Sequence, residues 1–331
     1  MQGEIFRPFL ILKCSLKAML TRRHIRVKVM QSVYAFNQSN NDSLQVEQKF
    51  LQKSMEEMYD LFLLNLSLLV EIKNRAATFI EKSQQKYLAT AEDKNPNLKF
   101  VQNELIQKIE QTEQFNTLLE DRKLNHWKRD DEYVGILWTA LKESELYTEY
   151  LKTRTSTFKE DKDFVIAMFK EIVAPNEKLY EYLEDKKLTW LDDLPIVNTS
   201  LVKLLKKVKE TDEQIKIPKL FKNLDDKEFA KDLFNKTVLH QEKYEEDIEG
   251  KTPNWDKDRI AEIDAVLLKM AICEFLKFSS IPVKVTINEY LEIAKEYSTP
   301  KSSIFINGIL DKLSKEYQES KKLNKIGRGL M

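Results

Sequence analysis

The chain has 331 residues, 54 Lys+Arg against 54 Asp+Glu, 42% hydrophobic residues and only 6 glycines. Average usage would give roughly 23 glycines, and glycine supplies the positive-φ positions that phosphate-binding loops and tight hairpins require. The composition therefore disfavours Rossmann, P-loop and all-β folds, and it predicts an all-α protein with enough apolar residues to form a core.

The N-terminal region is strongly basic. Residues 1–30 hold seven basic side chains and one acidic side chain, a net of +6. Met19 is an alternative start to Met1, so residues 1–18 are interpreted as an N-terminal extension. Thr21 is a suitable N-cap, and a helical apolar stripe follows it at Ile25, Val29, Val33 and Phe36. Because Arg22 and Arg26 are four residues apart, as are His24 and Lys28, we expect the solvent side of this helix to be basic.

Residues 19–52 are predicted to hold the N-terminal helices, and a long helical region begins within them. The spacing of Met55, Met58, Phe62, Leu66 and Leu69 indicates a helix from about Leu44 that runs with interruptions to Leu88. Ala91 to Asn97 reads as a linker. Further helices are predicted near 100–121, 131–152, 161–173, 176–187 and 197–209, with breaks at Pro175, Pro195 and Pro218.

The C-terminal region is predicted to form a helical bundle over residues 226–317. Helices are expected over about 226–249, from Asp258 to Phe278, from a capping box formed by Thr286 and Glu289, and from about Ser303 to Tyr317. Residues 318–331 read as a basic, flexible tail. Residues 311–331 carry a net charge of +3 and residues 31–310 a net of −9, so basic ends flank an acidic body. That distribution favours binding of a polyanion at one place.

An internal repeat relates residues 164–193 to residues 229–258 at an offset of 65. A weaker copy at an offset of 63 pairs Trp127 with Trp190 and Asp130 with Asp193. The repeat predicts a unit of two helices joined by a turn that a tryptophan side chain fills, and this unit occurs more than once in the chain. The alternative is that helical segments of similar composition align by chance.

No catalytic constellation is evident. The sequence lacks GxSxG, HExxH and phosphate-binding motifs, and its three histidines, His24, His126 and His240, are too scattered to bind a metal. Cys14 and Cys273 form no CxxC pair, which fits a reducing, cytoplasmic setting, and Cys273 is expected to be a buried, inert thiol. The Asp192–Asp193 and Asp225–Asp226 pairs are expected to cap helix starts. We therefore expect neither catalysis, nor a cofactor, nor a metal site.

Three further expectations come from charge and hydropathy. The lysines at 203, 206, 207 and 209 read as a solvated helix face. No apolar run approaches the roughly 18 residues of a membrane span, and the apolar stretch Phe9 to Leu12 is too short for a signal peptide.

Two separated stretches resemble the NusB family of transcription antitermination factors, and together they cover about residues 21–52 and 226–317. The first is the run Arg22-Arg23-His24-Ile25-Arg26 with Gln31 and Tyr34, which is similar to the family's opening helix. The second stretch contains Asp258-Arg259-Ile260, the helix Ala265 to Phe275, Ile281-Pro282, Val285, Ile287-Asn288-Glu289 and Ala294-Lys295. It ends with the run Phe305-Ile306-Asn307-Gly308-Ile309-Leu310-Asp311, and this run is close to the family's FVNGVLD signature.

The resemblance implies two small helical bundles and binding of the boxA element of ribosomal RNA transcripts. It also implies action with the ribosomal protein NusE in an RNA polymerase antitermination complex that reads through terminators. The RNA contacts that it implies, with the basic side chains beside them, are Arg22, Arg23, His24, Arg26, Lys28, Lys301, Ser302 and Phe305. His24 stands where an arginine is common, and Pro300 and Lys301 depart from the acidic loop that is frequent in the family.

The chain departs from the family in size. Residues 53–225 are interpreted as an inserted helical region with a structural or partner-docking role. The repeat suggests that this insert is a degenerate copy, or copies, of the family's own second-half helices. Two other functions compete with RNA binding. A helical protein-interaction scaffold is one. A relative of the N-terminal domains of rRNA methyltransferases is the other, although the few glycines leave no place for a cofactor loop.

Overall fold

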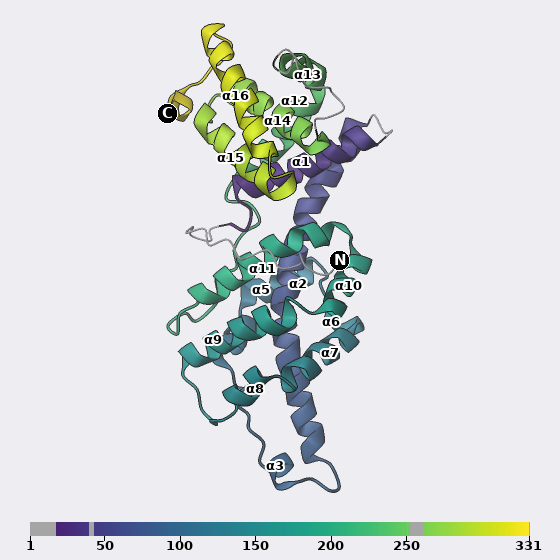
Figure 1. Cartoon of the computed structure of the whole chain (residues 1–331). Coiled ribbons are helices and arrows are strands. Elements are labelled where there is room, and N and C mark those ends of the chain that lie inside the picture. The colour runs from purple at the N-terminus through teal and green to yellow at the C-terminus, as the bar shows by residue number, and fades with distance from the viewer. Residues whose placement is uncertain (1–17, 40–42, 250, 252–260, 331) are drawn as a thin grey trace. The chain divides into compact units, whose positions relative to one another are not determined.

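A computed structural model describes residues 18–39, 43–249, 251 and 261–330. The described residues form helices and no strand, and their one β-bridge joins Ala18 to Lys219 (Figure 1). The predicted all-α fold is confirmed. Predictions about residues 1–17, Trp255 and the Asp258-Arg259-Ile260 turn fall outside this part of the chain. Within the described ranges, no helix is both long and apolar enough to cross a membrane.

The chain divides into two compact units. The described residues of the first unit are 18–19 and 56–219, and those of the second are 20–39, 43–55, 220–249, 251 and 261–330. The long helix α2 (Leu44–Gln84) contributes to both units. The apolar stripe predicted on this helix is buried from Met55 to Leu69.

The first unit is built from α2 and the short helices that follow it. These are α3 (Ala91–Lys94), α4 (Glu104–Glu110), α5 (Glu113–Asp121), α6 (His126–Arg129), α7 (Asp131–Lys142), α8 (Glu145–Tyr150), α9 (Phe158–Met168), the π-helical turn Phe169–Val173, α10 (Glu177–Lys186) and α11 (Thr189–Lys207).

Two buried tryptophans attach to α2 in the same way. The indole Nε1 of Trp127 donates to the carbonyl of Leu64 at 3.0 Å, and that of Trp190 donates to the carbonyl of Glu57 at 2.9 Å. The two acceptors are seven residues apart, which is about two turns of the helix. Trp127 and Trp190, which the sequence repeat pairs at the offset of 63, therefore make equivalent contacts with α2.

Several predicted boundaries in the first unit were wrong. Pro195 was expected to end a helix, yet α11 continues through it. A proline costs a helix one hydrogen bond, and here buried Trp190 and Leu201 secure the helix on either side of it. The segment 100–121 divides at Thr112, whose hydroxyl donates to the Lys108 carbonyl and accepts from the Ile215 amide.

The second unit surrounds α14 (Glu262–Lys277), which is buried continuously from Val266 to Phe275. Five helices pack on it: α1 (Arg22–Gln38), α12 (Leu224–Leu239), α13 (Gln241–Glu249), α15 (Val283–Tyr297) and α16 (Ser302–Glu319). The predicted single helix over 226–249 is wrong, because the chain breaks at His240 between α12 and α13.

The segment after α16 returns to the unit. The Lys325 ammonium donates to the carbonyls of Glu274 and Phe278 at 3.2 and 2.9 Å, and the Ile326 amide donates to the Ser279 carbonyl at 3.1 Å. A short 3₁₀ turn (Gly327–Leu330) follows. The residues predicted as a flexible tail thus make specific contacts at the C-terminal end of α14.

Candidate functional site

The N-terminus of α1 is electropositive. Thr21 caps the helix: its hydroxyl accepts from the His24 amide at 3.3 Å, and His24 Nδ1 accepts from the Thr21 amide at 3.4 Å. The first turn contains Arg22 and Arg23 and no acidic residue. Because a helix N-terminus also carries a partial positive charge, this turn favours an anionic ligand. The predicted N-cap is confirmed, and His24 acts there as a capping residue.

Arg22 and Arg23 are both held by carboxylates. Arg22 Nε lies 3.0 Å from Asp226 Oδ1, and its guanidinium lies 5.0 Å from the centre of the Phe229 ring. Arg23 forms a bidentate pair with Glu289 at 3.0 and 2.9 Å. The Arg22 side chain is 42% exposed and that of Arg23 is 21% exposed. Arg22 is therefore the more accessible of the two.

The pKa values reflect the Arg23–Glu289 pair. The hydrogen bond to Glu289 raises the pKa of Arg23 further. Burial of Glu289 opposes its ionisation, but the hydrogen bond and the charge of Arg23 outweigh that effect and hold the pKa of Glu289 below its ordinary value. A carboxylate with a lowered pKa and a bidentate partner is a strong competitor for any anion that approaches Arg23.

Arg26 and Lys28 do not lie on the solvent side, and that prediction was wrong. Both side chains are only 2% exposed. Arg26 forms a bidentate pair with Glu274 at 2.9 and 2.7 Å, and Glu274 is itself fully buried. Desolvation opposes the charge on Arg26, but the neighbouring carboxylate outweighs it and raises the pKa of the guanidinium. Arg26 thus ties α1 to α14 and offers no surface to a ligand.

Glu274 is satisfied by groups from a third helix. The Thr286 hydroxyl donates to it at 2.7 Å and the Tyr290 hydroxyl at 3.3 Å, both from α15. The predicted capping box of Thr286 and Glu289 was therefore wrong, because α15 begins at Val283 with Pro282 as its N-cap. Thr286 instead binds Glu274, the partner of Arg26, and Glu289 pairs with Arg23. A sequence signal existed, because a glutamate within the apolar run of α14 needs a buried cation as partner.

The predicted loop site lies at the start of α16. Lys301 is exposed, and Phe305 is half-buried one turn later. Ser302 is 3% exposed, and its hydroxyl lies 2.9 Å from that of Ser298 and 2.8 Å from that of Thr299. Ser302 therefore closes the loop, while Lys301 remains accessible to a ligand.

The outer face of α16 is unusually open. Ile304 is 75% exposed, and a Cβ built on Gly308 would meet no heavy atom of the described chain within 4 Å. Gly308 is therefore not the site of a close contact between described helices. The two parts of the predicted site, at α1 and at α16, are on separate helices that both pack on α15.

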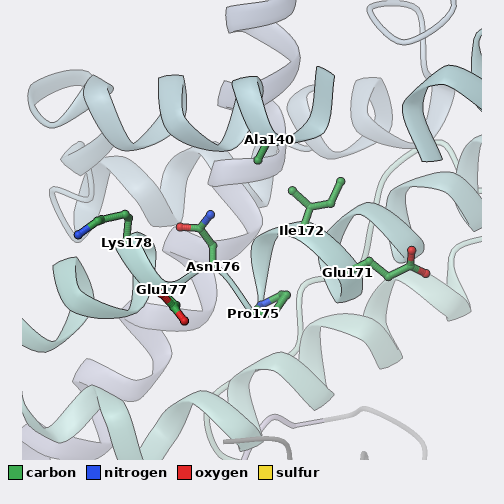
Figure 2. Close-up of a pocket in the computed structure, with 7 residues that line it drawn as sticks. All are labelled: Ala140, Glu171, Ile172, Pro175, Asn176, Glu177 and Lys178. Carbon is green, nitrogen blue, oxygen red and sulfur yellow. The ribbon is translucent and has the colours of Figure 1, made fainter. Parts of the chain in front are cut away.

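A shallow pocket of about 520 Å³ lies in the first unit. It is lined by Ala140 of α7, by the end of the π-helical turn and by the start of α10 (Figure 2). Figure 2 shows Glu171 and Lys178 at opposite sides of this pocket, and Lys178 pairs with Glu181 at 2.7 Å. This lining offers no nucleophile with an adjacent base.

Cys273 is buried among apolar residues of α14. Burial raises the pKa of its thiol to about 11, so the thiolate is scarce at neutral pH and the group is a poor nucleophile. The expectation of a buried, unreactive thiol fits this environment.

Comparison with known proteins matches residues 196–315 to the NusB family. The transcription antitermination protein NusB of Salinibacter ruber is 46% identical over 105 residues, which are 32% of this chain and 66% of the relative. The protein of the same name from Chloroherpeton thalassium is 42% identical over 105 residues, or 50% of its length. That of Natranaerobius thermophilus is 36% identical over 99 residues, which are 30% of this chain and 71% of the relative.

The matched region therefore spans about half to two thirds of the first two relatives. The match to the family, over 196–315, includes most of α11, α12 to α15 and the greater part of α16, but not α1. No solved structure matches the chain.

Proposed function

Because the chain belongs to the NusB family, we propose that it is an RNA-binding transcription antitermination factor without catalytic activity. The observation that supports the proposal best is the first turn of α1, where Arg22 and Arg23 stand at a capped helix N-terminus with no acidic residue in that turn. Guanidinium groups and helix N-termini both bind phosphate oxygens well.

Arg22 is the principal RNA contact in this proposal. Its side chain is 42% exposed, and it makes one hydrogen bond to Asp226 through Nε, which leaves its two terminal nitrogens for a phosphate. To contact the RNA, Arg23 would have to give up part of its ion pair with Glu289. Lys301 and Phe305 at α16 would supply a second charge and a ring for base stacking, as single-stranded RNA recognition commonly uses.

The resemblance supplies the finer part of the proposal. The RNA would be a boxA-like element of ribosomal RNA transcripts, bound together with the ribosomal protein NusE in the cytoplasm, so that RNA polymerase reads through terminators. Residues 53–225 would be an inserted region between the NusB-like parts 19–52 and 226–317. Arg26 and Lys28 are not part of the proposed contact surface, because both are buried.

RNA binding of the full chain tests the proposal. We expect Arg22→Ala with Arg23→Ala to weaken binding to a boxA-like RNA by at least tenfold, because two guanidinium–phosphate contacts are lost. We also expect the double variant to reduce the salt slope of log K by about 1.4, at about 0.7 per phosphate. Lys284→Ala with Lys277→Ala on the same unit is the matched control. A wild-type salt slope near zero would overturn the RNA-binding function.

A helical protein-interaction scaffold is the second candidate. The exposed side chain of Ile304 beside open Gly308 favours a protein contact on α16. Tight binding of a protein partner, unchanged in the Arg22 and Arg23 variant and without any RNA affinity, would support this alternative.

A further inference from the structure

The C-terminal end of α11 in the first unit carries a cluster of unpaired lysines. Lys206 and Lys207 occupy the last turn and Lys209 lies two residues beyond it, and all three are exposed. Among the described residues, none of these three ammonium groups has a carboxylate within 4.0 Å. The positive charge at this end of the helix is therefore available to solvent.

The backbone at this end is already served by two other cations. Lys162 of α9 donates to the Val208 carbonyl at 3.2 Å. Lys108 of α4 donates to the carbonyls of Glu210 and Asp212 at 3.0 and 2.8 Å. Lysines near a helix C-terminus usually complement the helix dipole. Here Lys108 and Lys162 bind the carbonyls that directly follow the helix, so the three exposed lysines are not needed for those carbonyls.

The rest of the unit has the opposite charge. Residues 56–202 contain 20 basic and 28 acidic residues, a net of −8, whereas residues 203–219 contain six lysines and three acidic residues, a net of +3. Three exposed lysines elsewhere in the unit pair with acids: Lys86 with Asp93, Lys152 with Glu149 and Lys178 with Glu181. Residues 203–219 thus differ from residues 56–202 in the sign of their net charge.

The type of ligand follows from what surrounds the lysines. Every apolar side chain between residues 203 and 219 is buried, including Val208, Ile215 and Ile217. A protein partner needs an apolar centre in its interface, and this surface has none to offer. A phosphodiester backbone needs only a set of cations.

We infer that the α11 basic end (Lys206, Lys207 and Lys209) is a second contact for the phosphate backbone of single-stranded RNA. This inference rests on the proposed function and adds to it a sequence-independent contact in the first unit. The surrounding net charge of −8 repels RNA elsewhere on this unit and so restricts binding to the α11 basic end.

The test compares two triple variants of the full chain. Lys206→Gln/Lys207→Gln/Lys209→Gln removes the exposed charges of the α11 basic end. Lys86→Gln/Lys152→Gln/Lys178→Gln removes the same charge from lysines that already have carboxylate partners in the same unit. Fluorescence anisotropy follows binding to single-stranded RNA of about 40 nucleotides that carries a boxA-like element, between about 50 and 200 mM salt. Circular dichroism checks that both variants fold.

We expect the first variant to bind at least fivefold more weakly at the lower salt concentration. Its salt slope should fall by up to about 2, at about 0.7 for each phosphate contact. The paired-lysine variant should stay within twofold of wild type. Equal losses in the two triple variants would overturn the inference, because net charge alone would then explain the effect.

RNA binding by the whole protein and RNA binding at the α11 basic end can be tested separately. If the Arg22 and Arg23 variant loses RNA binding while the Lys206, Lys207 and Lys209 variant keeps the wild-type slope, the inference about α11 is wrong and the proposed function stands. If the wild-type protein shows no salt-dependent RNA affinity, the proposed function fails, and the inference fails with it.

Discussion

Arg26 and Glu274 form a bidentate ion pair, at 2.9 and 2.7 Å, in which both side chains are withdrawn from solvent. The pair joins α1 to α14, and the rings of Phe229 and Tyr290 lie 5.3 and 5.8 Å from the guanidinium carbon of Arg26. An arginine in an RNA-binding sequence pattern is therefore a core residue here. Its neighbours at positions 22 and 23 keep part of their surface exposed.

Breaking this buried pair should be costly. Glu274→Ala leaves Arg26 charged in the core with only its longer contact to Glu289 at 3.6 Å, and we expect a loss of about 3–5 kcal/mol in the free energy of unfolding. Replacing both partners, as Arg26→Met/Glu274→Leu, should recover much of that loss. Urea denaturation measures both variants. A loss below about 1 kcal/mol in Glu274→Ala would show that the pair contributes little.

Removing the carboxylate that holds Arg23 should strengthen RNA binding. Glu289→Gln eliminates the competitor for the guanidinium and one negative charge beside the site, so we expect about threefold to tenfold tighter binding at low salt. Glu292→Gln is the control, because Glu292 lies 3.9 Å from Arg23 and makes the weaker contact. Weaker binding in Glu289→Gln would instead show that Glu289 orients Arg23 for the RNA.

The same carboxylate should make stability depend on pH. The pKa of Glu289 is lower in the folded protein than its ordinary value of 4.5. The unfolded state therefore takes up a proton first as the pH falls. The stabilisation is fully present above the unfolded pKa and is lost as the pH falls through the folded value. Between neutral and acidic pH, the urea midpoint should fall more steeply for wild type than for Glu289→Gln. Parallel plots of midpoint against pH for the two proteins would refute this expectation.

The two tryptophans on α2 should have similar energetic roles. Trp127→Phe and Trp190→Phe each remove one indole hydrogen bond to a helix carbonyl, and we expect each to cost about 1 kcal/mol from that bond, in addition to lost packing. Trp138→Phe is the matched control for size: Trp138 is 6% exposed and packs against Phe100. Thermal or urea denaturation compares the three, and a much larger effect at only one tryptophan would argue against equivalent roles.

Gly308 should be replaceable without penalty in the isolated protein. Because no heavy atom of the described chain lies within 4 Å of its Cβ position, Gly308→Ala should stabilise α16 by about 0.4–1 kcal/mol. A destabilised variant would mean that the glycine has an intramolecular role. A stable variant with impaired binding of RNA or of a protein partner would place the partner on the outer face of α16.

The helical fold followed from local properties of the chain. The scarcity of glycine, the apolar stripes from Ile25 to Val33 and from Met55 to Leu69, and the Thr21 cap depend on residues close together in the sequence. Boundaries were less predictable where packing opposed local preference. Pro195 within α11 and the break at His240 are examples, since tertiary contacts decide whether a helix continues through a weak position.

The sequence by itself determined the helical class, the segregation of charge and the resemblance to one family. Each of these is a property of composition, periodicity or residue order. Only the tertiary structure decided what each charge does. Arg22, Arg26 and Lys206 are all basic residues of predicted helices. Arg22 is paired and partly exposed, Arg26 is buried against Glu274, and Lys206 is exposed with no carboxylate partner in the described part of the chain. The physical reason is that the energy of a charge depends on its burial and on partners as far as 266 residues away in the chain, and the formal charge of zero reports neither.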